Sequence, residues 1–329
     1  MAIMQAIVHR NYGLPDVLTF ETIARPVPGV DDVLIRVHAA CATIGDHHVV
    51  TGKPYLIRLS PFGGVPRPKN RVPGALMAGR VEAVGANVTT FRPGDEVFGQ
   101  ATAGAFAEYL VMPAKMVARK PSNLTFEEAA AVPWAATALQ GLRDAGGLKA
   151  GQKVLINGAA GGVGSWAVQI AKALGAEVTA VCSTRNVERV HALGADHVLD
   201  YNAEDFVAGG ARFDVMLDLV GNRSLSDCRG VLVPGGAYVP CAGGDGDWLG
   251  PLARIAGGLL SFLFSGRRFR MFVMTPTQDD LLFLKALVEA GKGRPIIERR
   301  YSLSEVAEAL RHVGEGHAQG QTVIFCQPN

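Results

Sequence analysis

The sequence predicts an α/β protein that joins a turn-rich β domain to a domain with a doubly wound parallel sheet. Three observations support this prediction. Residues 1–120 contain many short strand patterns at close spacing, which is typical of a barrel-like β domain. Residues after Gly151 alternate between apolar strand patterns and helical patterns, which favours a parallel sheet covered by helices. A glycine-rich turn between a strand and a helix opens this second part.

The composition is that of a folded protein with an ample core. The 329 residues suffice for two domains, and 48% hydrophobic with 19% charged residues is far from the composition of a disordered chain. The 32 basic and 30 acidic residues give a net charge of +2. This balance favours neither nucleic acid nor an anionic membrane as a partner.

The cysteines and the N-terminus bear on the cellular compartment. The five cysteines are scattered without a CxxC pair, which fits neither a disulfide framework nor a structural zinc site. We therefore expect a reducing, cytoplasmic location. Residues 1–10 lack a long apolar core and a cleavage site, so we expect them to form the first strand rather than a signal peptide.

The expected strands of the first part alternate between apolar and polar residues. Val33, Ile35 and Val37 share one face of such a strand, which predicts that it is half-buried. Further strand patterns occupy residues 79–86, 96–98, 104–111 and 116–119.

An alanine-rich segment follows this β domain. Ser122 or Thr125 can cap a helix, because their side-chain oxygens can accept from its first backbone N–H groups. We expect this helix over residues 127–145, with a break near Pro133.

The second part is organised around residues 153–175. Val154–Ile156 is a short apolar run, as expected of a strand buried on both faces. Four glycines follow between residues 158 and 164, and then a helical stripe that ends at Gly175. This arrangement places backbone N–H groups at the positive end of a helix dipole, where the pyrophosphate of a dinucleotide binds.

The strands of the second part are expected at residues 153–157, 177–182, 197–200, 213–218 and 236–241. Residues 248–264 are apolar, but these 17 residues contain Pro251 and Arg254 and are too short for a convincing transmembrane helix. They form either a buried or pocket-covering helix or, since Arg267, Arg268 and Arg270 follow, a membrane-surface segment.

Three more elements close the chain. Residues 268–275 predict a strand and residues 278–291 a helix. A capping box at Ser302 opens another helix that we expect to end at Gly314, before a closing strand at residues 322–325.

The end of the second strand of the parallel sheet bears on the identity of the nucleotide. In dinucleotide-binding folds, an acidic residue there binds the adenosine ribose and indicates NAD. Here the strand runs into Ser183, Thr184 and Arg185, with no Asp or Glu. Two hydroxyls and a guanidinium suit a 2′-phosphate, so we expect NADPH. The alternative is that Ser183 or Thr184 only caps the next helix and that Arg185 is solvated.

Taken together, these residues resemble the medium-chain dehydrogenase/reductase superfamily, in its zinc-independent quinone oxidoreductase and enoyl reductase branch. The stretches that carry the resemblance span nearly the whole chain: residues 12–18, 73–74, 78–85, 92–99, 104–109, 129–133, 158–164, 193–201 and 214–221. The resemblance implies a GroES-like β-rich catalytic domain of residues 1–121 and 276–329, and a Rossmann NADP-binding domain of residues 122–275. It also implies a homodimer that pairs through an edge strand at residues 268–275.

The resemblance further assigns cofactor contacts to particular residues. It implies that the turn binds the pyrophosphate, that the end of the second strand surrounds the 2′-phosphate, and that later loops contact the ribose and nicotinamide. The residues are Ala159, Ala160, Gly161, Gly162, Val163 and Gly164 for the turn; Ser183, Arg185 and Tyr201 for the phosphate, next to the Thr184 hydroxyl already noted; Val220 and Gly221 for the ribose; Ala242 and Gly243 for the nicotinamide; and Thr137 for a further contact with the cofactor.

Zinc-dependent relatives bind their catalytic metal through a Cys, a His and a third Cys or acid. The corresponding positions here are Thr43, residues 74–76 and residues 134–136, and none of them offers a zinc ligand. His47 and His48 are adjacent on an expected strand, so they point opposite ways and do not form a ligand pair. We therefore expect no metal.

Two further positions depart from the family pattern. Leu76 stands where many zinc-free relatives carry Asp. Gln321 stands where a basic residue often helps to hold the cofactor.

Without a Lewis acid, hydride addition to a conjugated acceptor is easier than reduction of an unactivated ketone. Residues 43–55 are expected to line the site, with Thr43, Asp46, His47 and Tyr55 as catalytic candidates. Tyr55 is a candidate proton donor, although aromatic packing is the commoner role of Tyr. Thr43 and His47 are the alternatives.

The expected function is an NADPH-dependent reductase of quinones or α,β-unsaturated carbonyls. One alternative is an enoyl-thioester reductase, for which Arg67, Lys69 and Arg71 could form a basic entrance if they are more than a solvated loop. Another is a nucleotide-binding sensor or structural protein without turnover. We expect neither a nucleic-acid partner nor stable membrane insertion.

Overall fold

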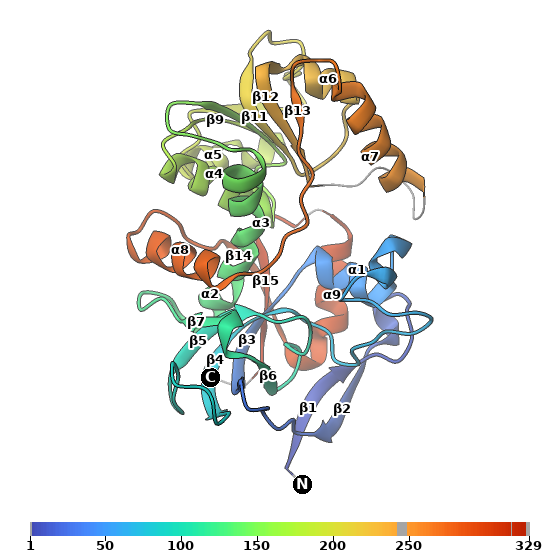
Figure 1. Cartoon of the computed structure of the whole chain (residues 1–329), viewed down its shortest axis with the longest axis vertical. Helices are drawn as coiled ribbons and strands as arrows, with labels where there is room; N and C mark the ends of the chain where they lie inside the picture. Colours follow the sequence, from blue (N-terminus) through green and yellow to red (C-terminus); the bar gives the residue numbers. More distant parts are fainter. Residues whose placement is uncertain (1, 242–248, 317, 327–329) are drawn as a thin grey trace. The chain divides into compact units, whose positions relative to one another are not determined.

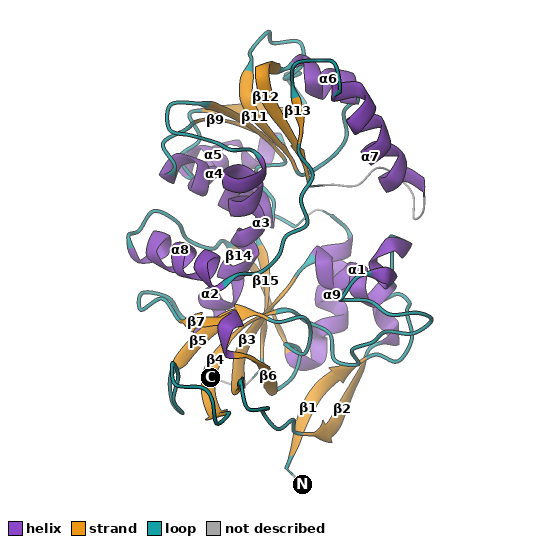
Figure 2. Ribbon diagram, in the orientation of Figure 1, coloured by secondary structure: helices purple, strands orange, loops and turns teal. Residues whose placement is uncertain are grey.

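The computed structural model of the chain describes residues 2–241, 249–316 and 318–326 (Figures 1 and 2). The chain divides into two compact units. The first comprises Met1–Pro133, Pro276–Ala290 and Arg294–Asn329, and the second comprises Trp134–Thr275 and Gly291–Gly293.

The first unit contains the β-rich part of the chain. Its strands are β1 (Ile3–Val8), β2 (Thr19–Ala24), β3 (Asp32–Ala42), β4 (Leu76–Val84), β5 (Glu96–Gln100), β6 (Tyr109–Pro113), β7 (Val117–Arg119), β14 (Ile297–Ser302) and β15 (Gln321–Phe325). Strands β1 and β2 form an antiparallel pair. The other seven form one sheet in the order β14-β15-β3-β4-β5-β7, with β6 paired to β3. The segments on either side of the second unit thus meet in one sheet.

Strand β3 shows why these residues form a sheet with a buried face. Val33, Ile35 and Val37 are fully buried, and Arg36 between them is exposed. The helices of this unit are α1 (Ile44–Thr51), α2 (Phe126–Ala131), α8 (Gln278–Glu289) and α9 (Val306–Gly314). Thr125 caps α2, so the expected cap is confirmed there rather than at Ser122.

One expectation for this unit is wrong and another is confirmed. His47 and His48 lie on helix α1 rather than on a strand, because the Thr43 side chain caps a helix that begins at Ile44. Helix α9 ends at Gly314, as expected, and the left-handed backbone (φ 73°) follows two residues later at Gly316.

The second unit is built on a six-stranded parallel sheet. Its strands are β8 (Lys153–Asn157), β9 (Glu177–Cys182), β10 (His197–Asp200), β11 (Phe213–Asp218), β12 (Leu232–Pro240) and β13 (Arg268–Phe269). Their order is β10-β9-β8-β11-β12-β13, so the chain winds outward in both directions from β8 and β11. This is the doubly wound order of dinucleotide-binding folds, which bind ligands at the carboxyl ends of the strands where the winding reverses.

The helices of the second unit cover both faces of the sheet. They are α3 (Ala135–Leu139), α4 (Gly162–Ala173), α5 (Val187–Ala192), α6 (Leu225–Gly230) and α7 (Leu249–Phe262). Helices α4 and α5 lie on one face and α6 and α7 on the other (Figure 1). The break expected near Pro133 is confirmed, because a 3₁₀ turn at Val132–Trp134 separates α2 from α3.

The expected strand at residues 268–275 is mostly wrong. Only Arg268 and Phe269 pair with β12, and residues 270–275 continue beyond it without strand pairing. Strand β13 lies at the edge of the sheet, where no further strand among the described residues pairs with it. No helix in the described part of the chain is long and apolar enough to cross a membrane.

Candidate functional site

The glycine-rich turn lies between β8 and α4, at the carboxyl ends of the parallel strands. A Cβ atom at Gly164 would lie 2.1 Å from the Gly158 carbonyl oxygen, so only glycine lets helix and strand approach this closely. At Gly161, by contrast, the nearest atom to an added Cβ is 3.8 Å away, so space is open at the helix N-cap. This open cradle fits a pyrophosphate.

Arg189 on α5 reaches the same turn. Its guanidinium donates to the Ala160 carbonyl oxygen at 2.8 Å. The positive charge therefore lies beside the phosphate cradle, where it can favour an anion. Sequence reasoning missed Arg189, although its spacing of one helical turn from Arg185 was an available signal.

The end of β9 carries the residues expected around a 2′-phosphate. The Ser183 hydroxyl oxygen accepts from the Asn186 side chain at 2.9 Å, which fixes its orientation and leaves its proton available. The Thr184 hydroxyl donates to Asp200, and this hydrogen bond lowers the pKa of the Asp200 carboxyl group. The Thr184 hydroxyl proton is therefore engaged by the Asp200 carboxylate.

Arg185 and Tyr201 complete this group. Arg185 is exposed and has no hydrogen bond or ion pair with any other residue in the described ranges. The Tyr201 side chain is 55% exposed, while its backbone N–H donates to the Cys182 carbonyl at 3.1 Å. The fold thus brings both side chains to the end of β9 with their polar groups accessible.

A buried carboxylate orders the loop that follows β11. Asp218 is fully buried, and its Oδ1 accepts from the backbone N–H groups of Val220 at 3.2 Å and Gly221 at 2.9 Å. The Asn157 side chain donates to the same oxygen at 2.9 Å. Asp218 therefore positions the loop expected beneath the ribose and ties it to the end of β8.

The other Asp218 oxygen holds helix α7. The Tyr238 hydroxyl donates to Oδ2 at 2.8 Å, and Arg254 on α7 lies 3.3 Å from it. Arg254 also donates to the Tyr238 hydroxyl oxygen at 2.6 Å. Sequence reasoning missed this network, because its members come from three separate elements.

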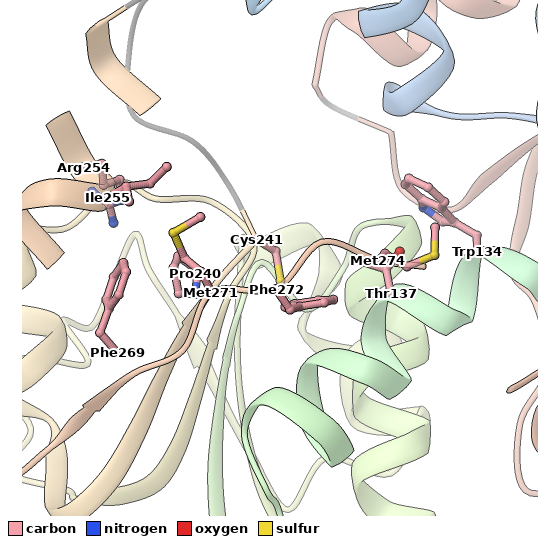
Figure 3. Close-up of a pocket in the computed structure, with 10 residues that line it drawn as sticks. All are labelled: Trp134, Thr137, Pro240, Cys241, Arg254, Ile255, Phe269, Met271, Phe272 and Met274. Atoms are coloured by element: carbon pink, nitrogen blue, oxygen red, sulfur yellow. The ribbon is translucent and has the colours of Figure 1, made fainter. Parts of the chain in front are cut away.

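A largely apolar cavity of about 330 Å³ lies in the second unit, near the end of β12 (Figure 3). Thr137, expected at the cofactor, is one of its lining residues. The full set is Trp134, Thr137, Pro240, Cys241, Arg254, Ile255, Phe269, Met271, Phe272 and Met274. Aromatic and methionine walls with few polar groups suit a flat apolar ring. Ala242 and Gly243 lie outside the described residues.

The expected catalytic stretch in the first unit begins with a helix cap. The Thr43 hydroxyl donates to Asp46 Oδ2 at 2.7 Å, and the Thr43 backbone N–H donates to the same oxygen at 2.9 Å. The Asp46 backbone N–H donates in return to the Thr43 hydroxyl oxygen. Burial of Asp46 raises the pKa of its carboxyl group to about 6, against the opposing effect of these hydrogen bonds.

The two histidines lie on α1 beyond this cap. Their ring centroids are 6.1 Å apart. The His47 imidazole packs against Gly314 of α9, where an added Cβ would lie 2.5 Å from its Nε2 atom. Desolvation lowers the pKa of both imidazoles, which favours their neutral forms.

Tyr55 begins a short 3₁₀ helix after α1. Its ring is partly exposed and lies 4.6 Å from the Arg58 guanidinium, which also faces the Tyr12 ring at 4.4 Å. The Tyr55 ring therefore packs against a guanidinium while part of it stays exposed.

Other residues bear on whether the chain can bind a metal or hold the cofactor. No cluster of three His, Cys, Asp or Glu side chains that could hold a metal lies within the described ranges. Leu76 is buried in β4, and the Gln321 side-chain oxygen accepts from the Ile296 backbone N–H at 2.8 Å. Gln321 therefore has a structural contact inside the first unit.

Comparison with known proteins gives the family. Residues 29–122 match the alcohol dehydrogenase GroES-like domain, and residues 193–324 match the zinc-binding dehydrogenase family. The chain is 34% identical to the 2-methylene-furan-3-one reductase of Solanum lycopersicum, covering 99% of this chain and 80% of the relative. It is 33% identical to the mitochondrial NAD(P)H oxidoreductase RTN4IP1 of Mus musculus, covering 98% and 89%.

A solved structure extends this likeness to the whole fold. The quinone oxidoreductase from Coxiella burnetii is 29% identical to this chain, with a TM-score of 0.85 over 99% of this chain and all of the other. The expected α/β architecture, with a GroES-like and a Rossmann part, is confirmed. The chain is an NAD(P)H-dependent oxidoreductase that belongs to the medium-chain dehydrogenase/reductase superfamily, in the branch of quinone oxidoreductases and enoyl reductases.

Proposed function

We propose that the protein is an NADPH-dependent reductase that transfers hydride to quinones or α,β-unsaturated carbonyl compounds without zinc. The observation that carries the coenzyme choice is the exposed Arg185 at the end of β9, which pairs with no other described residue and lies beside a Ser183 hydroxyl with its proton available. The names of the relatives support the acceptor class, since one reduces a methylene-furanone and another is a quinone oxidoreductase.

The zinc-free proposal rests on the residues at the ligand positions of the family. Thr43 is engaged in a helix cap, and Ala75 and Trp134 carry no metal-ligating group. The bound nicotinamide would supply the hydride. Conjugated acceptors suit such a site because charge moves to an oxygen that a protein hydroxyl can stabilise.

We propose Tyr55 as the proton donor, with Thr43 and His47 as alternatives. The Tyr55 ring is partly exposed, with the Arg58 guanidinium beside it, and the Thr43 hydroxyl donates to Asp46. Asp46 would then act by positioning Thr43. A Tyr55→Phe variant should lower kcat while leaving NADPH affinity unchanged, and an unchanged kcat would transfer the role to another group.

The function is tested by NADPH oxidation with a panel of quinones, enones and enoyl thioesters. Turnover of quinones or enones is expected. Arg185→Ala should weaken NADPH binding by about 10- to 150-fold, as expected for losing a charge-assisted contact to phosphate. NADH binding should be unchanged, and equal losses for both nucleotides would refute the proposed role of Arg185.

Enoyl-thioester reduction remains the second candidate. Arg67, Lys69 and Arg71 are all exposed on the loop before β4, as a site for a carrier phosphate requires. Preference for enoyl thioesters, lost on replacing these residues by Gln, would support it. Tight NADPH binding without turnover of any acceptor would instead indicate a sensor or structural protein.

The assembly and location are also proposals. We propose a homodimer through the β13 edge and residues 270–275, where Val273 is 80% exposed and Met271 46%. Light scattering should give a mass near twice 34.7 kDa, falling to one copy for Val273→Asp. We also propose a cytoplasmic location. The proposed domain limits are 1–121 with 276–329 for the catalytic domain and 122–275 for the cofactor domain.

A further inference from the structure

The segment that follows β13 has no strand pairing, yet its side chains alternate regularly. Phe272 and Met274 are half-buried, whereas Met271, Val273 and Thr275 are exposed. Among the described residues, no backbone–backbone hydrogen bond holds residues 271–275 to another element. An extended segment without such bonds keeps one position only where side chains fix it.

Gln140 fixes the carboxyl end of this segment. Its amide nitrogen donates to the Thr275 carbonyl oxygen at 2.7 Å, and its amide oxygen accepts from the Thr275 backbone N–H at 3.2 Å. These two bonds copy the exchange that a residue of a neighbouring antiparallel strand would make. Gln140 is only 9% exposed, so water competes weakly for the same groups.

The backbone around Gln140 allows this close contact. Gln140 begins a π-helical turn (Gln140–Ala145), a type of winding that is frequent at functional sites. The next residue, Gly141, lies against the Phe272 ring, and a Cβ atom added to it would be 3.3 Å from that ring and 2.9 Å from Leu217. The segment is therefore held by a polar contact at Thr275 and by an aromatic contact at Phe272.

The same segment forms a wall of the apolar cavity in the second unit (Figure 3). Three of its side chains line the cavity together with one residue of α3 and the N-cap of that helix: Met271, Phe272, Met274, Thr137 and Trp134. Gln140 directly follows α3 and binds the end of the segment. Gln140 thus joins two parts of the cavity lining.

We propose that Gln140 is a positioning residue that sets the width of this cavity, and that the cavity takes the apolar ring of the acceptor. The proposal rests on the reductase function proposed above. Arg254, the charged side chain in the lining, is neutralised by Asp218, so a ring with few polar groups is favoured there. The carboxamide of a nicotinamide needs hydrogen-bond partners, of which the lining side chains offer few.

The test compares Gln140→Met with the original full-length protein, with 1,4-naphthoquinone as the probe. Quenching of tryptophan fluorescence measures its binding without NADPH, since Trp134 lines the cavity. The Kd should rise about fivefold, as for the loss of one hydrogen bond, and KM should rise with it while kcat changes little. Gln169→Met is the matched control, because Gln169 donates to the Ser165 carbonyl at 3.0 Å within its own helix, and it should leave the Kd unchanged.

Gln140→Glu gives a readout that a simple loss of stability would not move. At pH 8 its carboxylate faces the Thr275 carbonyl oxygen and cannot donate, whereas at pH 5 the protonated acid can donate as the amide does. The affinity of this variant for naphthoquinone should therefore recover as the pH falls. The affinity of the original protein should stay constant.

An unchanged Kd in Gln140→Met, an equal rise in Gln169→Met, or no recovery in Gln140→Glu at pH 5 would refute the role of Gln140. Naphthoquinone binding that NADP⁺ abolishes would assign the cavity to the coenzyme ring and refute the proposed occupant. Binding is measured without turnover. A protein that binds naphthoquinone in this way but does not oxidise NADPH would therefore contradict the reductase proposal and not the assignment of the cavity.

Discussion

Replacement of Asp218 by Asn should destabilise the protein strongly although the two side chains have the same shape. Oδ1 accepts from Asn157 and the loop N–H groups, and Oδ2 faces Tyr238 and Arg254. An amide has one oxygen only. If that oxygen stays with the loop, the NH₂ group opposes the Tyr238 hydroxyl and the Arg254 guanidinium, donor against donor.

The magnitude follows from the burial of the ion pair. The Asp218 side chain is fully buried and that of Arg254 is 15% exposed, so solvent screens the pair weakly. Breaking a buried pair by removing one charge costs about 3–5 kcal/mol, because the other charge remains buried. We expect this loss in the free energy of unfolding, together with weaker NADPH binding as the Val220–Gly221 loop shifts.

Urea denaturation followed by tryptophan fluorescence measures the first effect, and isothermal titration calorimetry the second. Asp214→Asn is the matched control at the other end of β11. Asp214 forms no ion pair with another described residue. It accepts from the Lys153 backbone at 2.8 Å and the Gln152 side chain at 3.3 Å, so its Asn variant should lose about 0.5–1.5 kcal/mol of unfolding free energy. Equal losses for the two variants would refute the reasoning.

Three further predictions concern the turn, a helix contact and a buried acid. Gly164→Ala should lower both the stability of the protein and its affinity for NADPH, because the added Cβ would meet the Gly158 carbonyl at 2.1 Å. Gly161→Ala should lower the affinity alone. Identical behaviour of the two variants in denaturation and in NADPH titration would contradict this prediction. Gly314→Ala should cost about 1–3 kcal/mol by overpacking against His47, and His47→Ala should rescue it in a double-mutant cycle. The pKa of Asp46 is raised from 3.8 to about 6. The folded state therefore favours the protonated carboxyl group. The contribution of Asp46 to the free energy of unfolding is complete below pH 4 and falls by about 3 kcal/mol as the pH rises to 6 and above. The free energy of unfolding is measured at pH 4 and at pH 7, and the fall between the two should be absent in Asp46→Asn. The same fall in the variant and the original protein would show that Asp46 has an ordinary pKa.

Much of the fold was predictable because strand alternation and glycine requirements are local. The four strands at residues 153–157, 177–182, 197–200 and 213–218 were predicted with the bounds that the structure gives them. The turn was also predictable, since a strand, closely spaced glycines and a helix stripe are adjacent in sequence. The catalytic stretch was less so, because the cap between Thr43 and Asp46 turned an expected strand into α1.

The sequence by itself determined the glycine turn between β8 and α4, since the backbone geometry of the turn depends on residues that are neighbours in the chain. Only the tertiary structure showed that Gly314 makes room for His47, that Asp218 joins a loop to α7, and that the leucines of α7 face solvent. These facts depend on pairs of segments far apart in sequence. Helical periodicity shows that a face is apolar, but packing on the sheet decides which face is covered.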